Sequence, residues 1–202
     1  EICSIIFKYI ILNLSMIPNK KKKKALEETV EEMRNFSFSY IEKYSPSKQQ
    51  LKTYLLKKYL NFKSSNTNKN NVKDLIEAVI GDLEKSKFIN DQFYSSSKAK
   101  SLINRGSSIN KIRNYLLKKG IKDSYVNNAI TQIKEQNEDQ DFFSAVKLCK
   151  KKRIGPARDD NNRPLFYKKD IGILARSGFD FETSKRVMDI DKNEYSKIIN
   201  LL

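Results

Sequence analysis

The chain has 202 residues, which suits one large domain or several small units with separate cores, and its six glycines and four prolines are too few for the turns of a β-sandwich or barrel. Its 39% hydrophobic content excludes a wholly disordered chain, and its formal net charge of +16 favours a polyanionic partner, chiefly nucleic acid or an acidic membrane face. Without histidine, and with only the two distant cysteines Cys3 and Cys149, the chain has no imidazole for catalysis and too few ligands for a cysteine zinc site, and it is expected in a reducing compartment, the cytoplasm.

The first segment, residues 1–24, is apolar at its start and lysine-rich at its end. The apolar run from Ile2 to Ile17 is too short to span a membrane comfortably, and no basic stretch precedes it, so a signal peptide or anchor is not expected. Met16 and the lysines that follow it resemble a cytosolic start, which suggests that residues 1–15 come from upstream translation. We expect this segment to lie outside the folded core.

Three helices are predicted next. Apolar residues from Leu26 to Tyr44 recur at helical spacing and predict the first helix. Ser47 stands three residues before Gln50, which is the spacing of a capping box, and this pair predicts the start of the second helix. A polar insertion over residues 61–71 predicts a solvated loop, and the amphipathic pattern over residues 72–83 predicts the third helix.

The same order of helices is predicted again in the middle of the chain. One helix starts near Asp91, and a second runs from Ser108 to Lys119. Gly120 then suits the left-handed residue that commonly follows a helix. Asp123 or Ser124 is expected to cap a third helix, because both side chains can accept a hydrogen bond from a free backbone N–H.

A third round of helices opens at Asp141, turns at Gly178 and ends in a short terminal helix. The chain also repeats itself, because residues 51–60 match residues 112–121 with Tyr, Leu, Leu, Lys and Lys in register, and residues 170–179 are a weaker third copy. Tandem units of this kind contact mainly their neighbours and form long bodies. The predicted fold is all-α, with three tandem three-helix repeats in an elongated, curved array, and the repeats span residues 25–85, 86–135 and 136–202.

Positive charge gathers in two places. From Lys98 to Lys122 the chain holds eight basic residues and no acidic one, and residues 150–158 form a basic loop in which Gly155-Pro156 must turn. A solvated surface is the plain interpretation of both places; the functional one is contact with phosphates or an acidic partner, which Arg158 and Arg163 would make in bidentate fashion. The candidate binding residues are Lys98, Lys100, Arg105, Lys111, Arg113, Lys118, Lys119, Lys151, Arg153, Arg158 and Arg163.

Several motifs resemble those of the RecX family of regulatory proteins. The stretch from Phe88 to Tyr94, with Asn90-Asp91 in its turn, is similar to the opening of the family's central repeat. Arg105-Gly106 and Lys119-Gly120-Ile121 then follow in the family's order. The sequence departs from the family pattern at Tyr94-Ser95, where Phe-Ala is usual.

The resemblance extends over residues 25–190. Residues 47–55 resemble the first repeat of the family, with Gln50 in place of Glu, and residues 154–158 and 170–179 resemble the third. The resemblance implies a cytoplasmic monomer that binds the RecA recombinase filament, lies in its helical groove, and inhibits its activities in recombination, DNA repair and the SOS response. It also implies contact with single-stranded or filament-bound DNA, and no catalytic residue, metal or cofactor.

Two other functions stay open. Residues 116–125 have the layout of a helix–turn–helix, as in a sequence-specific DNA-binding protein, although the helix that follows offers almost no basic residues for a groove. A metal-dependent nuclease would need converging carboxylates, and Asp159-Asp160 is the only such pair near the basic loop. Neighbouring loop residues seldom converge on one metal without further ligands, so the nuclease is the weaker alternative.

Overall fold

The structure is a computed structural model that describes residues 29–60 and 69–202. Within these residues it contains ten α-helices, α2 to α11, two short 3₁₀ helices and no β-strand, so the predicted all-α fold is confirmed. The expectations for residues 1–15, for the lysines before residue 25 and for most of the polar insertion lie outside the described residues.

The N-terminal unit consists of α2 (Val30–Tyr44), α3 (Lys48–Leu60) and α4 (Lys69–Lys85), which all contact one another. The predicted capping box opens α3: the Ser47 N–H donates to Gln50 Oε1 at 3.1 Å, and the Gln50 N–H donates to Ser47 Oγ at 3.3 Å. Residues 69–71 belong to α4 and not to a loop, so the predicted insertion reached three residues too far. The fully buried core includes Met33, Leu51, Leu55, Ile76 and Ile80.

The middle unit consists of α5 (Asp91–Asn104), α6 (Ile109–Lys118) and α7 (Asp123–Gln136), packed around a separate core. Gly120 has φ +75°, as the predicted left-handed residue after a helix requires. The predicted cap of α7 was wrong. Lys122 occupies the capping position without a side-chain hydrogen bond, and Asp123 is already the first helical residue.

The C-terminal unit consists of α8 (Gln140–Lys152), the 3₁₀ helices η1 (Gly155–Ala157) and η2 (Asp160–Asn162), and three more helices, α9 (Arg163–Arg176), α10 (Phe181–Met188) and α11 (Lys192–Leu201). Helix α8 contacts α10 and α11, and η1 contacts α8, α9, α10 and α11. The predicted turn at Gly155-Pro156 is the first part of η1, and both residues are buried. This bend therefore packs against the third core and does not project as an arm.

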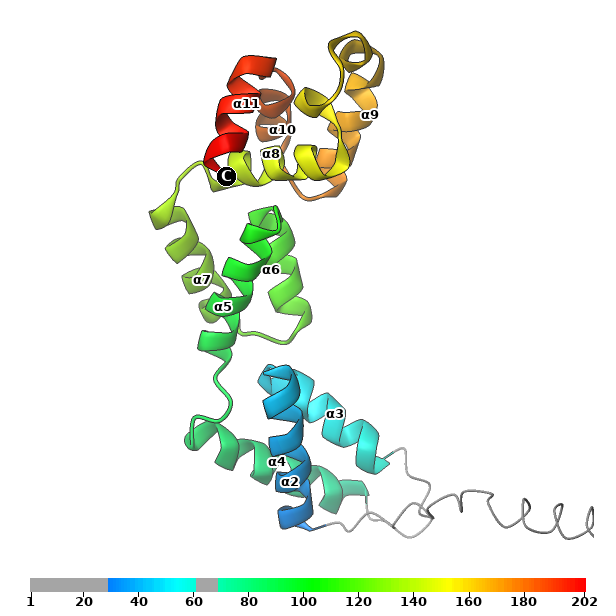
Figure 1. The fold of residues 1–202 in the computed structure, drawn as a ribbon. Helices are drawn as coiled ribbons and strands as arrows, with labels where there is room; N and C mark the ends of the chain where they lie inside the picture. Colours follow the sequence, from blue (N-terminus) through cyan, green and yellow to red (C-terminus); the bar gives the residue numbers. More distant parts are fainter. Residues whose placement is uncertain (1–28, 61–68) are drawn as a thin grey trace, which may run out of the picture.

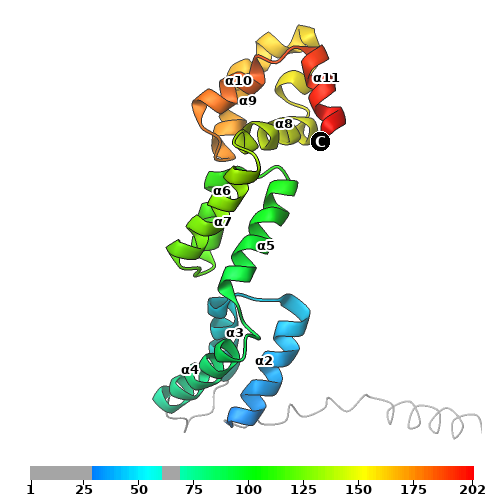
Figure 2. The ribbon, with the colours of Figure 1, turned by 90° about the vertical axis from the view of Figure 1, so that its left-hand side faces the viewer.

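The three units follow one another along one long axis and do not surround a common core. Figure 1 shows the N-terminal unit at the bottom, the middle unit above it and the C-terminal unit at the top. Figure 2, turned by 90°, shows the same order and the same elongated outline.

The first junction, between the N-terminal and middle units, joins helix ends. The Lys48 N–H at the start of α3 donates to Asp91 Oδ1 at 2.8 Å, and Ser47 Oγ donates to the backbone oxygen of Lys119 at 2.8 Å. The first N–H groups of a helix have no partner within the helix, and the last carbonyl groups have none either. The junction therefore satisfies a free donor of one unit and a free acceptor of the next.

The second junction, between the middle and C-terminal units, uses the same chemistry. The Ile109 N–H at the start of α6 donates to Asp141 Oδ1 at 2.8 Å, and Ser108 Oγ donates to the backbone oxygen of Ser177 at 2.9 Å. Glycine follows the accepting carbonyl group at both junctions. A Cβ atom on Gly120 would lie 2.5 Å from Gln49 Cβ, and one on Gly178 would lie 2.5 Å from Ser108 Oγ, so the helices meet where only glycine fits.

Candidate nucleic-acid and partner interface

The predicted binding residues other than Arg158 and Arg163 lie on or next to three helices. Helix α5 carries Lys98 and Lys100 and is followed by Arg105; α6 carries Lys111, Arg113 and Lys118 and is followed by Lys119; α8 carries Lys151 and is followed by Arg153. The exposed members of this set are Lys100, Arg105, Lys111, Lys118, Lys151 and Arg153.

Two of these lysines meet at one aromatic ring. Lys98 Nζ lies 5.8 Å from the centroid of the Tyr115 ring, and Lys119 Nζ lies 5.4 Å from the same centroid. Both distances are within the range of a cation–π attraction. The structure thus brings together a cation from α5 and one from the end of α6, which the sequence pattern alone does not relate.

Two arginines of the predicted set are engaged within the C-terminal unit. Arg158 Nε and Nη2 donate to the two carboxylate oxygens of Asp170 at 2.6 and 2.9 Å, and Arg163 Nη2 donates to the backbone oxygens of Met188 and Ile190, each at 2.7 Å. The bidentate geometry expected of Arg158 towards a partner is therefore made within its own chain. In this structure the guanidinium groups of Arg158 and Arg163 are therefore engaged within the chain.

The carboxylate of Asp170 anchors the basic loop. Its side chain is fully buried, and the Gly155 N–H also donates to Asp170 Oδ2, at 2.9 Å. Burial by itself would raise the pKa of Asp170, but the hydrogen bonds from Arg158 and from the Gly155 N–H outweigh burial and hold the pKa below its ordinary value. Asp170 is therefore ionised in the folded chain, and Arg158 compensates its buried charge.

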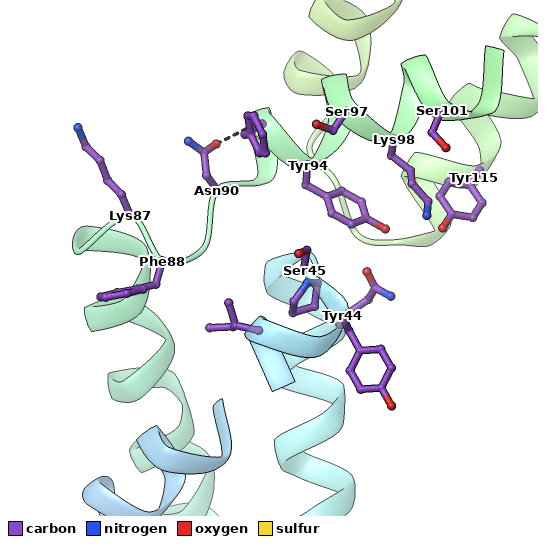
Figure 3. Close-up of a pocket in the computed structure, with 14 residues that line it drawn as sticks. Tyr44, Ser45, Lys87, Phe88, Asn90, Tyr94, Ser97, Lys98, Ser101 and Tyr115 are labelled. Atoms are coloured by element: carbon purple, nitrogen blue, oxygen red, sulfur yellow. Dashed lines mark hydrogen bonds between the residues drawn. The ribbon is translucent and has the colours of Figure 1, made fainter. Parts of the chain in front are cut away.

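A cavity of about 650 Å³ lies between the N-terminal and middle units, and we call it the Tyr94 cavity. Figure 3 shows the Tyr94 ring pointing from α5 towards the turn between α2 and α3, with the Lys98 ammonium group directed at Tyr115. Tyr44 and Phe93 also line it, and their side chains are 57% and 72% exposed. Cavities of this size hold small molecules or single side groups of larger partners.

Burial raises the pKa of Tyr94, and a hydrogen bond with the Tyr115 side chain raises it further. The phenol of an ordinary tyrosine is uncharged at neutral pH, and both effects move the pKa of Tyr94 further above that range. The wall of the cavity is thus formed by neutral rings and hydroxyl groups, with positive charge from Lys98 beside them.

A second cavity, of about 350 Å³, shares Gln50 with the first; we call it the Tyr40 cavity. The rings of Tyr40 and Tyr54 stack in its wall, with centroids 4.1 Å apart and planes 10° apart. Lys118 and Lys119, both in the predicted set, line this cavity as well.

The sequence analysis missed the aromatic part of this site. The sequence pattern places Tyr40 and Tyr44 in an apolar helical stripe, and Tyr94 in a motif that resembles the RecX family and departs from it at this position. Tyrosine at the margin of an apolar stripe is a usable signal, because its hydroxyl group favours a position at the edge of the core.

The structure gives no support for metal chemistry or for a buried catalytic thiol among the residues it describes. In residues 29–60 and 69–202 no three side chains of His, Cys, Asp or Glu are grouped so that they could hold a metal ion. Asp160 lies 3.9 Å from Arg163 Nη1 and 3.7 Å from Lys192 Nζ. Burial raises the pKa of Cys149 to about 12, which keeps it a thiol.

Two further findings bear on the class of protein. None of the described helices combines the length and the apolar content that crossing a membrane requires. Helix α7, which would be the second helix of a helix–turn–helix, carries Lys134 as its one basic residue. This composition offers little to the phosphates of a duplex groove.

Comparison with known proteins finds RecX proteins by both sequence and structure. The chain is 29% identical over 178 residues to the regulatory protein RecX of Myxococcus xanthus (strain DK1622), a match that covers 85% of this chain and 94% of the relative. This match supports a RecX family protein. The regulatory protein RecX of Clostridioides difficile (strain 630) is 30% identical over 121 residues, which cover 57% of this chain and 53% of that protein.

The RecX fold is found as well. A crystal structure of a regulatory protein RecX superposes with a TM-score of 0.55 at 21% identity and covers 80% of this chain and 74% of that chain. No protein-family model matches the chain. The resemblance to RecX that the motifs indicated is therefore confirmed, and the relatives are named as regulatory proteins.

Proposed function

We propose that the chain binds the filament of the RecA recombinase and inhibits its activities in recombination, DNA repair and the SOS response, without catalysing a reaction. The names of the RecX relatives and the motifs at Phe88–Tyr94 and Lys119–Ile121 support a regulatory role. We further propose that it acts in the cytoplasm as a monomer.

The observation that carries this proposal is the long body with two matched junctions. Each unit has its own core, and Ser47 and Ser108 make the same pair of hydrogen bonds at the two boundaries. We therefore propose that the units are tandem repeats, spanning residues 25–85, 86–135 and 136–202, in a curved array. A long body of equivalent units suits a groove in a filament of equivalent subunits.

We also propose that the exposed cations on α5, α6 and the end of α8 face the filament or its DNA. Lys98, Arg113 and Lys119 are partly buried, and we propose that they lie at the edge of this surface. Arg113 has a structural role too, because its Nη1 donates to Asn127 Oδ1 at 2.7 Å. Arg158 and Arg163 are left out of the surface, because their guanidinium groups are already engaged.

The test is the RecA-dependent ATPase on single-stranded DNA, with and without this protein. Wild type should lower the rate. A variant with Lys100, Arg105, Lys111 and Lys118 reversed to Glu should need an about tenfold higher concentration for the same inhibition, because four ion pairs of about 0.2–1 kcal/mol each approach or exceed the 1.4 kcal/mol of a tenfold change. No change in the rate with wild type would contradict the proposed function.

The matched control reverses four exposed lysines elsewhere in the chain. Lys73 and Lys85 on α4 and Lys185 and Lys197 in the C-terminal unit are all exposed, so their reversal changes the net charge equally. This control should inhibit like wild type. Equal loss in both variants would mean that net charge, and not a particular face, carries the effect.

A further inference from the structure

The Tyr94 and Tyr40 cavities form one aromatic and basic surface, which we call the cavity surface. Gln50 lines both cavities, and the Tyr115 ring in the first is contacted by Lys119, which lines the second. The surface draws on α2 and α3 of the N-terminal unit and on α5 and α6 of the middle unit. It therefore exists only where the first junction holds the two units together.

This surface combines aromatic rings with lysines. Seven aromatic side chains and five lysines line the two cavities, and within the part of the chain that the structure describes no aspartate or glutamate lines either one. Tyr54, Tyr40 and Tyr44 follow one another along it, with ring centroids 4.1 and 4.8 Å apart. The side chains of Tyr44 and Phe93 are more than half exposed, so apolar ring area faces solvent beside positive charge.

We propose that the cavity surface binds single-stranded DNA, with unpaired bases stacked on its rings and phosphates beside its lysines. A single strand presents a base face and a phosphate with every nucleotide, which suits a surface that carries both aromatic rings and lysines. A duplex hides its base faces, and the cavity surface has no long basic helix for a groove. The choice of DNA over RNA rests on the proposed function, whereas the stacking does not.

The Tyr94 cavity has the size and the polar groups for a base. Its volume of about 650 Å³ lies within the usual range of small-molecule sites. Ser97, Ser101 and Asn90 line it together with the rings, as Figure 3 shows, and their side chains can donate to or accept from a base edge. The neutral Tyr94 phenol adds no negative charge that would repel a phosphate.

The first experiment uses unmodified protein and no RecA, so its outcome is separate from that of the ATPase assay. Because the chain contains no tryptophan, its intrinsic fluorescence reports tyrosine. A labelled oligothymidylate should bind and quench this emission, and an abasic strand with the same phosphates should bind about tenfold more weakly and quench little, since stacking contributes about 1–3 kcal/mol per base. Equal affinity for the two strands would overturn the stacking.

The second experiment uses paired variants. Phe93→Ala combined with Tyr44→Ala should lower the affinity for oligothymidylate about tenfold or more while leaving the melting temperature close to that of wild type, because both rings are exposed. The control is Phe181→Ala in the C-terminal unit, where the ring is 71% exposed against 72% for Phe93. It should bind like wild type. Unchanged binding by the double variant would overturn the proposal.

The third experiment tests the lysines and the alternative partners. Lys98→Gln with Lys118→Gln should lower affinity and flatten the dependence of log affinity on log salt by about 0.7 for each phosphate that is no longer neutralised. Oligouridylate bound more tightly than oligothymidylate would overturn the assignment to DNA. A competition assay compares an acidic peptide that contains phenylalanine with unlabelled oligothymidylate. If the peptide displaces the labelled strand at the lower concentration, the surface binds a peptide and the proposal is overturned.

Discussion

The carboxylate of Asp141 accepts a hydrogen bond from the backbone N–H of Ile109, at 2.8 Å, across the boundary between the middle and C-terminal units. Asp141 belongs to α8, and Ile109 opens α6. One unit thus supplies an acceptor for the first N–H of a helix in the unit before it, in addition to the Ser108 cap. Burial raises the pKa of Asp141 and outweighs the hydrogen bond from Ile109, which lowers it, so the pKa lies above its ordinary value.

Replacing Asp141 separates the hydrogen bond from the charge. Asp141→Ala leaves the Ile109 N–H without its acceptor and should lower the free energy of unfolding by about 1–3 kcal/mol. Asp141→Asn keeps an acceptor oxygen and should cost less than about 1 kcal/mol at neutral pH. Urea denaturation of both variants measures the difference. An alanine variant as stable as wild type would show that the junction bond contributes nothing.

The pH dependence of the asparagine variant has a definite sign. Because the pKa of Asp141 is higher in the folded chain than in the unfolded one, wild type loses stability as the pH rises through that pKa. Asp141→Asn lacks this loss. Its stability relative to wild type should therefore increase between acidic pH, below the ordinary aspartate value of about 3.9, and neutral pH.

The buried carboxylate of Asp170 depends on Arg158 as its charged partner. Arg158→Ala leaves the Asp170 carboxylate buried and uncompensated and should lower the free energy of unfolding by about 3 kcal/mol. Adding Asp170→Asn should restore part of this loss, because it removes the buried charge. This account would be contradicted if the double variant, with Arg158→Ala and Asp170→Asn, were less stable than Arg158→Ala alone.

The same pair sets the acid stability of the C-terminal unit. The pKa of Asp170 is lowered in the folded chain, so its contribution is present above the ordinary aspartate pKa of about 3.9 and is lost as the pH falls through the lower folded value. Arg158→Ala should therefore cost less in acid than at neutral pH. Denaturation curves at several pH values test the sign.

Two glycines should respond to alanine in opposite ways. Gly120 has φ +75° and lies against Gln49, so Gly120→Ala should lower the free energy of unfolding by about 1–3 kcal/mol and loosen the first junction. Gly81 lies inside α4, and apart from its chain neighbours and the backbone of its own helix no atom lies within 4 Å of its Cβ position, so Gly81→Ala should raise stability by about 0.4–1 kcal/mol. Thermal melting of both variants measures the two signs, and a loss at Gly81 equal to that at Gly120 would contradict the conformational argument.

Local patterns predicted the local features of the fold. The spacing of Ser47 and Gln50 identified a capping box, and Gly120 was identified as a left-handed residue, because both depend on a few neighbouring residues. The predicted cap at Asp123 or Ser124 was wrong by at least one position, since a residue that can cap a helix can also occupy its first turn.

Contacts between distant residues could not be predicted in the same way. Nothing near Arg158 in the sequence indicates that Asp170 will accept from it, so the arginine was interpreted as a ligand for a partner. Lys98 and Lys119 are 21 positions apart. They meet only because α5 packs beside α6, which carries the Tyr115 ring that both lysines contact. Tyrosines of the cavity surface come from two units, and no single helical stripe contains them.

The two matched junctions also bear on the distance between successive units. Serine and aspartate fix the start of α3 against the middle unit and the start of α6 against the C-terminal unit through the same atoms, so the step from one unit to the next is set twice by one chemical rule. If the units are tandem repeats, as proposed, the two junctions favour a similar distance between successive units. A partner whose own subunits recur at that interval can be engaged in phase by successive units, whereas a partner with another spacing falls out of register beyond the first unit.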